Sequence, residues 1–342
     1  IGTGDWVADI IREASGGGGA GVELPHPYFW VVSNPEFLRE GSGVYDFMNP
    51  DRIVLGSTSR EAAEKVAELY APLNGEAIIT DLRTAEMIKY ASNAFLATKI
   101  SFINEIANIC ERVGADVSAV RRGIGADHRI GFHFIYPGMG FGGSCFPKDV
   151  KALINAARAH GYTPELIAAV DAVNQRQKGV LARKIEAFFS ARGGLAGRTL
   201  ALWGLAFKAN TDDVREAPAL ELIRALTAAG MRVKAYDPVA GSRARAVLGD
   251  NPLVELSELQ YEVIEAADAL AVATDWNQFR NPDFPRIQRM LKTPVIFDGR
   301  NLYDPEIVAG HGLGYVSIGR AGLGPGLSAE PASPPRGSGA LG

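Results

Sequence analysis

Residues 198–320 alternate short apolar runs with amphipathic helical stretches, and this alternation is the strongest constraint on how the chain can fold. The apolar runs cover Thr199–Leu205, Arg232–Tyr236, Ala269–Thr274, Val295–Phe297 and Gly314–Ile318, and Ala219–Ala229 is one of the intervening helices. Strands that alternate with helices in this way build βαβ units, whose strands are parallel. The sequence therefore predicts an α/β protein with a parallel sheet in this part of the chain.

A helical pattern without proline or glycine runs from Thr84 to Val113. At 1.5 Å per residue, such a helix is about 45 Å long. Its apolar positions, among them Ala91, Ile100 and Ile106, fall on more than one face, so we expect it to be buried from two sides. A helix of this kind usually forms a spine between domains or subunits, which favours a symmetric dimer.

The segment before the long helix contains weaker signals. Helices are expected from about Asp5 and over Ser59–Tyr70, and strands over Tyr28–Val32 (short and buried) and Asp51–Gly56. Residues 33–40 are expected to begin a helix, with Asn34 as its N-cap and Pro35 in its first turn. These elements resemble the end of an α/β layer.

Further helices are expected after the glycine-rich residues 137–144. One begins at Pro147 and runs through Ala159, and another helical stretch covers Glu165–Ser190. The last residues, 321–342, are rich in Gly, Pro and Ser, which predicts a disordered tail. The expected divisions of the chain are 1–80, 81–197, 198–320 and 321–342.

The composition of the 342 residues excludes several classes of protein. Hydrophobic residues make up 47% and the net charge is −4, which is typical of a globular protein rather than a disordered one. The 35 basic residues are outnumbered by 39 acidic ones and form no dense run, so nucleic acid is not expected as a partner. No apolar stretch approaches the ~18 residues that span a bilayer, so a membrane is not expected either.

The cysteine and histidine content bears on location and metal binding. Two cysteines, Cys110 and Cys145, are too few for a disulfide framework and fit a reducing cytosol, so we expect a cytoplasmic protein. The five histidines show no zinc-like spacing with each other or with cysteine, so no metal is expected.

Cys145 is the strongest candidate for a reactive side chain. Glycines precede it, and Pro147 suits the first turn of a helix, which would place Cys145 at a helix N-terminus. There the free N–H groups and the helix dipole stabilise a thiolate, to which Lys148 adds positive charge, as a nucleophile requires. The alternative is a buried cysteine in a glycine loop. Cys110 lies on an apolar stripe and is expected to be a core residue.

Pairs of polar residues four positions apart supply further candidates. Lys89 and Asn93 share one face of the long helix, where an amine and an amide can stabilise an oxyanion. The alternative for Lys89 is an ordinary solvated position. Glu36 and Glu40 would share a face of the helix opened by Pro35, either as a solvated surface or with Glu36 positioning a water.

A glycine-rich dinucleotide fingerprint is not found. Neither Gly16–Gly21 nor Gly41–Gly43 follows a strand and opens a helix within a βαβ unit. Gly204 follows a strand but lacks the second and third glycines, although Lys208 and Arg215 just beyond it are suited to holding phosphates.

Five motifs, read together, resemble the UDP-glucose 6-dehydrogenase family of nucleotide-sugar dehydrogenases. They are SNPEFLREG (33–41), KYASNAF (89–95), GFGGSCFPKD (140–149), GLAFKANTDDVREAP (204–218) and FDGRN (297–301). The resemblance implies a remnant of an N-terminal Rossmann-like NAD-binding domain, a long central dimerisation helix and a C-terminal Rossmann-like UDP-binding domain. It also implies that the family's glycine loop and most of the first domain would precede Ile1.

The same resemblance implies an oxidoreductase of nucleotide-sugar metabolism. It would oxidise UDP-glucose to UDP-glucuronate, a precursor for polysaccharide biosynthesis, in two NAD-dependent steps through a cysteine thiohemiacetal and thioester. Cys145 would be the nucleophile, Lys89 would stabilise an alkoxide, and Asn93, Asp149 and Glu36 would organise water and proton transfer. Substrate contacts would come from Phe37, Leu38, Arg39, Tyr136, Pro137, Gly138, Gly142, Lys208 and Arg300, with Arg129 from the partner subunit, and cofactor contacts from Glu40, Lys148 and Arg215.

Two alternatives stay open at this point. A GDP-mannose or UDP-N-acetylmannosamine dehydrogenase shares the thiol chemistry. A catalytically incomplete fragment that only dimerises and binds the nucleotide-sugar belongs to a different class. The second alternative predicts binding of UDP-glucose without NAD binding or turnover.

Overall fold

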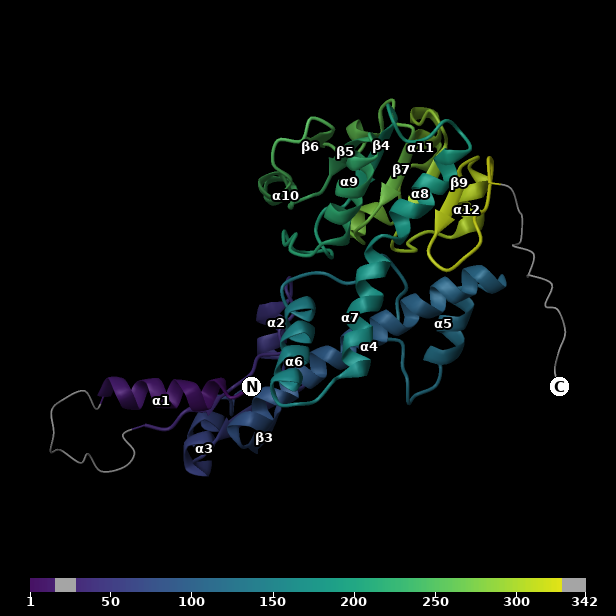
Figure 1. Ribbon diagram of the computed structural model, residues 1–342. Coiled ribbons are helices and arrows are strands. Elements are labelled where there is room, and N and C mark those ends of the chain that lie inside the picture. Colours follow the sequence, from purple (N-terminus) through teal and green to yellow (C-terminus); the bar gives the residue numbers. More distant parts are fainter. Residues whose placement is uncertain (16–28, 328–342) are drawn as a thin grey trace. The chain divides into compact units, whose positions relative to one another are not determined.

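A computed structural model describes residues 1–15 and 29–327, which form two compact units (Figure 1). The first unit consists of Ile1–Phe95 with Asn155–Tyr162, and the second of Leu96–Ile154 with Thr163–Gly342. None of the described helices combines the length and the apolar content that crossing a bilayer requires.

The first unit is built on a small three-stranded sheet. The order is β1-β2-β3, with β1 (Val32–Ser33) antiparallel and β3 (Glu76–Thr80) parallel to β2 (Arg52–Ser57). Its helices are α1 (Thr3–Ser15), α2 (Gly43–Met48), α3 (Arg60–Leu69) and the beginning of α4 (Leu82–Val113). Ile53 and Leu55 of β2 pack with Ala63 of α3 in its core.

Two expectations for this unit are wrong. Residues 33–40 do not begin a helix, because the Asn34 side chain donates to the Val54 carbonyl (2.9 Å) and accepts the Tyr70 hydroxyl instead of capping. The strand expected over residues 28–32 is limited to Val32–Ser33, which are only half-buried, and position 28 lies outside the described residues. The exposed strand β3 was not predicted.

The second unit contains a six-stranded, all-parallel sheet. Its strands are β4 (Thr199–Trp203), β5 (Arg232–Tyr236), β6 (Val254–Ser257), β7 (Ala269–Val272), β8 (Val295–Asp298) and β9 (Gly314–Ser317). The order β6-β5-β4-β7-β8-β9 corresponds to 3-2-1-4-5-6, the doubly wound Rossmann order. Five of these strands were predicted, and the predicted α/β class is confirmed.

Helices cover both faces of this sheet because successive side chains of each strand point to opposite sides. In β4, Leu200 and Leu202 belong to the apolar cluster that includes α8 and α9, whereas Ala201 and Trp203 belong to the opposite cluster. The helices of this region are α9 (Pro218–Ala228), α10 (Gly241–Leu248), α11 (Phe284–Met290) and α12 (Pro305–Gly310), with 3-10 turns at Glu262–Ile264 and Asn277–Phe279.

The helices that lie between β3 and β4 in the sequence follow the predicted pattern with two exceptions. Helix α4 spans Leu82–Val113 and α6 spans Phe146–Ala159, as expected, and α5 (Val117–Gly125) was not predicted. The stretch 165–190 is two helices, α7 (Glu165–Lys178) and α8 (Val180–Ser190). They separate at Gly179, whose amide bonds to the Arg176 carbonyl (3.3 Å), a tighter turn than the α-helix uses.

The expectation of a disordered tail from residue 321 is wrong for its first residues. Leu323 pairs with Tyr315 of β9 through backbone hydrogen bonds of 2.7 and 3.0 Å, which order the chain up to Leu327 against the sheet. The remaining residues of the expected tail, 328–342, lie outside the described residues.

Candidate active site

Cys145 lies at the N-terminus of α6. Its carbonyl accepts the Asp149 amide (2.8 Å), so the helical hydrogen bonding begins at Cys145, and its thiol is half-buried beside the Ser144 hydroxyl (3.5 Å). A helix N-terminus offers free N–H groups and the positive end of the helix dipole. The predicted placement of Cys145 at a helix start is confirmed, which is the setting that a reactive thiolate needs.

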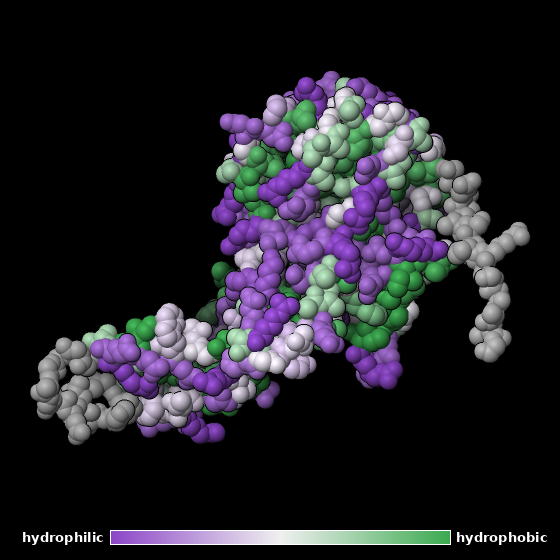
Figure 2. All heavy atoms as spheres, viewed as in Figure 1, coloured by the Kyte–Doolittle hydropathy of each residue, from purple (hydrophilic) through white to green (hydrophobic). Residues whose placement is uncertain are grey.

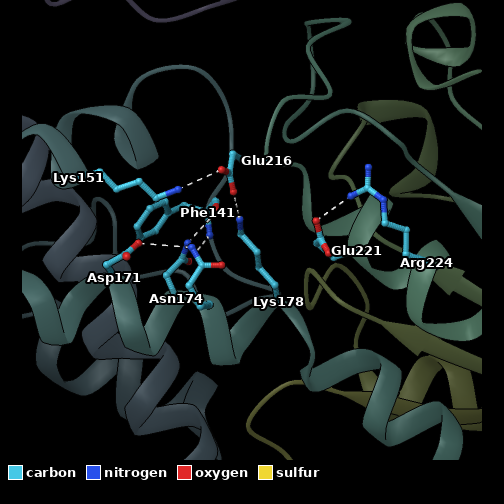
Figure 3. Close-up of polar contacts among 9 residues, drawn as sticks. Phe141, Lys151, Asp171, Asn174, Lys178, Glu216, Glu221 and Arg224 are labelled. Atoms are coloured by element: carbon cyan, nitrogen blue, oxygen red, sulfur yellow. Dashed lines mark hydrogen bonds and ion pairs between the residues drawn. The ribbon is translucent and has the colours of Figure 1, made fainter. Parts of the chain in front are cut away.

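The glycine loop (residues 137–144) leads to Cys145 and is held by buried side-chain amides. Asn174 bonds both ways with Phe141, accepting its N–H (2.8 Å) and donating to its carbonyl (3.0 Å), as Figure 3 shows. Gly138 donates to Asn104 (2.8 Å) and accepts from Gln177 (2.7 Å). All three amide side chains are 1% exposed, so the loop is fixed by bonds that do not compete with water.

The last glycines of this loop have no room for a side chain. A Cβ at Gly142 would overlap the carbonyl oxygen of Glu216, and one at Gly143 would lie 2.7 Å from the Phe207 ring. The Gly143 amide also donates to the Arg215 carbonyl (2.8 Å). The backbone of residues 215–216 therefore packs directly against the loop, which explains why two glycines precede Ser144.

Glu216 joins two lysines from different helices (Figure 3). One carboxylate oxygen lies 2.6 Å from Nζ of Lys178, which is 4% exposed, and the other lies 3.2 Å from Nζ of Lys151 on α6. The hydrogen bond from Lys178 is the main cause that lowers the pKa of Glu216. A carboxyl whose pKa is lowered by folding stabilises the fold above its ordinary pKa, and this contribution is lost as the pH falls below that value.

The turn after β4 lies where the strand order of the Rossmann sheet reverses, the usual ligand site of such sheets. Gly204 has φ +97°, and a Cβ there would lie 2.5 Å from Thr274, so only glycine fits. The following amides of Leu205 and Ala206 donate to Asp237 (2.8 and 3.1 Å). The turn therefore needs glycine at position 204 alone, and it forms although the second and third glycines of the dinucleotide fingerprint are absent.

Arg300 links the end of β7 to the turn that follows β4. Its guanidinium donates to the carbonyls of Ala273 (2.7 Å) and Phe207 (2.8 Å), and burial lowers its pKa from the ordinary value. The glycine loop lies beside it, because a Cβ at Gly138 would be 3.1 Å from the Gly299 carbonyl oxygen. Gly138, Gly142, Cys145, Arg215 and Arg300 are therefore brought together within this unit.

Three further predicted residues of this unit are Lys208 and Lys148, which lie on its surface, and Asp149, which is buried. Lys208 follows Phe207 and places its amine 5.5 Å from that ring, and exposed Arg215 is held by Asp213 (2.9 Å). Exposed Lys148 pairs with buried Asp149 (2.8 Å).

Three predicted substrate residues, Arg129, Tyr136 and Pro137, lie in the segment after α5. Arg129 is exposed and binds both oxygens of Asp127 (3.0 and 2.6 Å), which lowers the pKa of that carboxyl. Tyr136 is also exposed, and the guanidinium of Arg121 stacks 3.7 Å from its ring centroid. Pro137, the next residue, is buried at the start of the glycine loop.

In the first unit, Lys89 and Glu36 form a pair. The Lys89 side chain is 15% exposed, and its amine lies 2.9 Å from the Glu36 carboxylate, so it is not an ordinary solvated lysine. Phe37 packs below the Arg52 guanidinium, 3.8 Å from the ring centroid. Asn93 follows Lys89 by one turn of α4, so the two share a face of the helix as predicted, and Asn93 is buried.

The expectation that Glu36 and Glu40 share a helix face is wrong. Glu36 lies in an irregular segment, where its carboxylate accepts the Leu38 amide (2.6 Å), and Glu40 lies in the turn before α2. Between them, Arg39 forms a two-point ion pair with Asp46 of α2 (2.5 and 3.1 Å), which lowers the pKa of Asp46. This pair, rather than a helix, shapes the segment.

Sequence reasoning missed the residues that hold the glycine loop. They are Asn104, Asn174, Gln177, Lys178 and Glu216. The sequence did contain a signal for two of them. Positions 170, 174, 177 and 181 follow a helical spacing, and the two outer positions are the apolar residues Val170 and Leu181, whereas positions 174 and 177 are polar. Polar residues on a buried stripe indicate a specific hydrogen-bonding partner.

The close packing of the glycine loop predicts opposite effects for two glycine-to-alanine substitutions. Gly142→Ala forces the loop away from the Glu216 carbonyl and is expected to lower the free energy of unfolding by about 1–3 kcal/mol. Gly123→Ala, in α5 with open space around it, is expected to raise it by about 0.5–1 kcal/mol. Urea denaturation measures both, and equal effects of the two substitutions would contradict the packing described here.

Models of one protein family match three parts of the chain. The NAD binding domain of the UDP-glucose/GDP-mannose dehydrogenase family matches residues 1–74, its central domain residues 83–176 and its UDP binding domain residues 201–305. The expected resemblance is thereby confirmed, including NAD-binding-domain sequence at the beginning of the chain.

Curated relatives agree with these matches. The UDP-glucose 6-dehydrogenase of Pseudomonas aeruginosa is 47% identical over 336 residues, which cover 94% of this chain and 70% of the relative. The UDP-glucose 6-dehydrogenase TuaD of Bacillus subtilis is 50% identical over 320 residues, which cover 94% of this chain and 67% of the relative.

A solved structure agrees as well. The UDP-glucose dehydrogenase of the archaeon Pyrobaculum islandicum superposes with a TM-score of 0.80 at 38% identity, over 92% of this chain and 67% of that one. With three domain models matched in order and with relatives near half identical, the chain belongs to the UDP-glucose/GDP-mannose dehydrogenase family.

Proposed function

We propose that this protein oxidises UDP-glucose to UDP-glucuronate with NAD⁺ as the hydride acceptor. The observation that carries the proposal is Cys145, which lies at a helix N-terminus behind a rigid glycine loop in a chain of this family. Relatives that are 45–50% identical over most of the chain are UDP-glucose 6-dehydrogenases, which supports this substrate.

The proposed reaction removes two hydrides from C6 of the sugar. The first oxidation turns the C6 hydroxyl into an aldehyde, and Lys89 stabilises the alkoxide that develops. The Cys145 thiolate then adds to the aldehyde carbon to give a thiohemiacetal, which loses the second hydride to become a thioester. Water positioned by Glu36 cleaves the thioester, releasing the carboxylate and the thiol, while Asn93 and Asp149 organise water and proton transfer.

The residues proposed for the cofactor have suitable chemistry. Lys148 and Arg215 are exposed cations, which suit a pyrophosphate, and Asp213 fixes the orientation of the Arg215 guanidinium. Glu40 offers a carboxylate for a ribose hydroxyl. When bound, NAD⁺ supplies the hydride acceptor for both oxidations.

The nucleotide-sugar is proposed to bind through two groups of residues. Lys208 and Arg300 lie at the strand ends of the Rossmann sheet, where such sheets hold nucleotides. Phe37, Leu38 and Arg39, together with Tyr136–Gly142, would contact the sugar. The glycine loop suits close approach of a substrate, because its backbone is fixed and carries little side-chain bulk.

A comparison of two cysteine substitutions tests the proposed nucleophile. Cys145→Ser is expected to lower kcat on the order of 10³-fold or more, since serine is a poorer nucleophile and a poorer leaving group. The control Cys110→Ala changes a buried core residue whose pKa burial raises, and it should retain turnover. NADH formation is measured with UDP-glucose, GDP-mannose and UDP-N-acetylmannosamine.

The expected stoichiometry is two NADH for each UDP-glucuronate, with UDP-glucose the preferred substrate. Faster oxidation of GDP-mannose or of UDP-N-acetylmannosamine would replace the proposed substrate by that alternative. Full turnover by the Cys145→Ser variant would remove the covalent step.

We also propose a homodimer formed through the central helix α4. Phe102, Ile109 and Val113 lie at helical spacing on one face of α4 and are 51%, 49% and 70% exposed. A row of exposed apolar side chains of this kind is typical of a surface that a partner covers. Figure 2 shows hydrophobic surface where Figure 1 places α5 and the end of α4. In the dimer, exposed Arg129 would contribute to the partner subunit's substrate site.

Light scattering at micromolar concentration tests the dimer. The protein is expected to have the mass of two chains, and the double variant Phe102→Glu, Ile109→Glu the mass of one, because buried charges oppose association. The control Leu259→Glu, at an equally exposed apolar residue of the Rossmann sheet unit, should stay dimeric. A monomeric wild-type protein would be the contrary result.

Cytoplasmic location is proposed on chemical grounds. Both cysteines are free in the structure, and a catalytic thiol is preserved in a reducing compartment.

A further inference from the structure

Helix α7 presents three polar residues toward the glycine loop. Asn174, Gln177 and Lys178 are spaced i, i+3 and i+4, so they share one face of the helix. The two amides bond to the loop backbone at Phe141 and Gly138. Lys178 instead extends to the Glu216 carboxylate (2.6 Å), as Figure 3 shows.

The Lys178 ammonium is buried and therefore needs a compensating charge. A buried ion without a partner is strongly unfavourable, so the 4% exposed Lys178 side chain fixes where the Glu216 carboxylate must lie. Glu216 is also joined to Lys151, six residues after Cys145 on α6. One carboxylate thus connects α7 with α6, the helix that directly follows Cys145.

The backbone of Glu216 is held in an uncommon conformation. Its φ is +52°, in the left-handed region that residues with a Cβ rarely adopt. In this conformation the Glu216 carbonyl packs against Gly142, and the preceding Arg215 carbonyl accepts the Gly143 amide. Glu216 is therefore held at two points: its side chain by the ion pair with Lys178, and its backbone by the contact with the glycine loop.

The contacts divide the glycine loop into two parts. The side-chain amides hold Gly138 and Phe141, which are further from the thiol. The segment 215–216 holds Gly142 and Gly143, the last residues before Ser144 and Cys145. If Glu216 moved, Gly142, Gly143 and the Cys145 thiol would therefore shift with it, whereas Gly138 and Phe141 would stay held by the side-chain amides.

We propose that Glu216 is a positioning residue for Cys145, acting through its ion pair with buried Lys178 and its backbone contact with Gly142 and Gly143. The inference deepens the proposed function, since it concerns the alignment of the proposed nucleophile. Glu216 touches no reacting atom in this account. Its carboxylate sets the position of the loop end, and the loop end sets the position of the thiol.

Four variants test this proposal against a matched control. Glu216→Gln and Lys178→Met each break the pair, the double variant removes both partners, and Lys178→Arg keeps the charge. The control is Glu221→Gln, which breaks an exposed pair with Arg224 (2.8 Å) on the next helix, also drawn in Figure 3. For each variant, the iodoacetamide labelling rate of Cys145, the kcat and KM for UDP-glucose, and the thermal midpoint are measured.

Glu216→Gln is expected to lower kcat by about tenfold or more while KM for UDP-glucose changes less than about twofold, because small misplacement of a reacting group mainly affects the chemical step. The labelling rate of Cys145 should change at least about threefold, since the environment of the thiol is altered. The double variant should be no worse than the poorer single variant, because both remove one interaction. The Lys178→Arg variant should keep most of the wild-type kcat that Lys178→Met loses. The control Glu221→Gln should have the wild-type kcat and labelling rate.

The proposal would be overturned if the Glu216→Gln variant kept the wild-type labelling rate of Cys145 and the wild-type kcat. This holds even if the variant had a lower thermal midpoint, because the ion pair would then serve stability alone. Independent, additive losses from Glu216→Gln and Lys178→Met would overturn the role of the pair. The labelling rate needs no turnover, so it decides the positioning role even where UDP-glucose is not oxidised. Failure of the proposed function would appear separately, as absent NADH formation by the wild-type protein.

Discussion

The hydrogen bonds from buried amide side chains to the glycine loop are the interaction on which the proposed active site depends. Residues 137–144 are buried or half-buried yet form no helix or strand, so their backbone groups need other partners. Asn174 supplies both bonds of Phe141, and Asn104 and Gln177 supply those of Gly138. The loop is therefore rigid without regular structure, and Cys145 lies at its fixed end.

The two parts of the second unit cooperate in this arrangement. The central helices supply the amides and Lys178, whereas the Rossmann sheet supplies the turn that carries Glu216 and the strand end that carries Arg300. Glycine is needed where these parts meet, because Gly138 and Gly142 lie against the backbone of the sheet's loops. The absence of a side chain at these two glycines permits the close contact, and the ion pair between Glu216 and Lys178 keeps the two backbones in place.

The sequence predicted the elements whose signals are local. Helix α4 and strands β4 and β5 agree with the predicted ranges closely, because the apolar residues that mark each element lie within that element's own segment. Residues 33–40 were mispredicted because Asn34 bonds to Val54 and Tyr70, which are distant in the sequence. The motifs located Cys145, but the partners of its loop come from other helices, and no local pattern reveals such a pairing.

Hydrogen exchange of the glycine loop tests the central claim most directly. If buried amides satisfy the loop backbone, the peptide covering 137–143 should exchange about as slowly as strand β4, since both are protected by bonds shielded from water. Asn174→Ala should then accelerate exchange of this peptide while β4 stays protected. Wild-type exchange of 137–143 at the rate of an exposed loop would contradict a rigid loop, and with it the proposed basis for positioning Cys145.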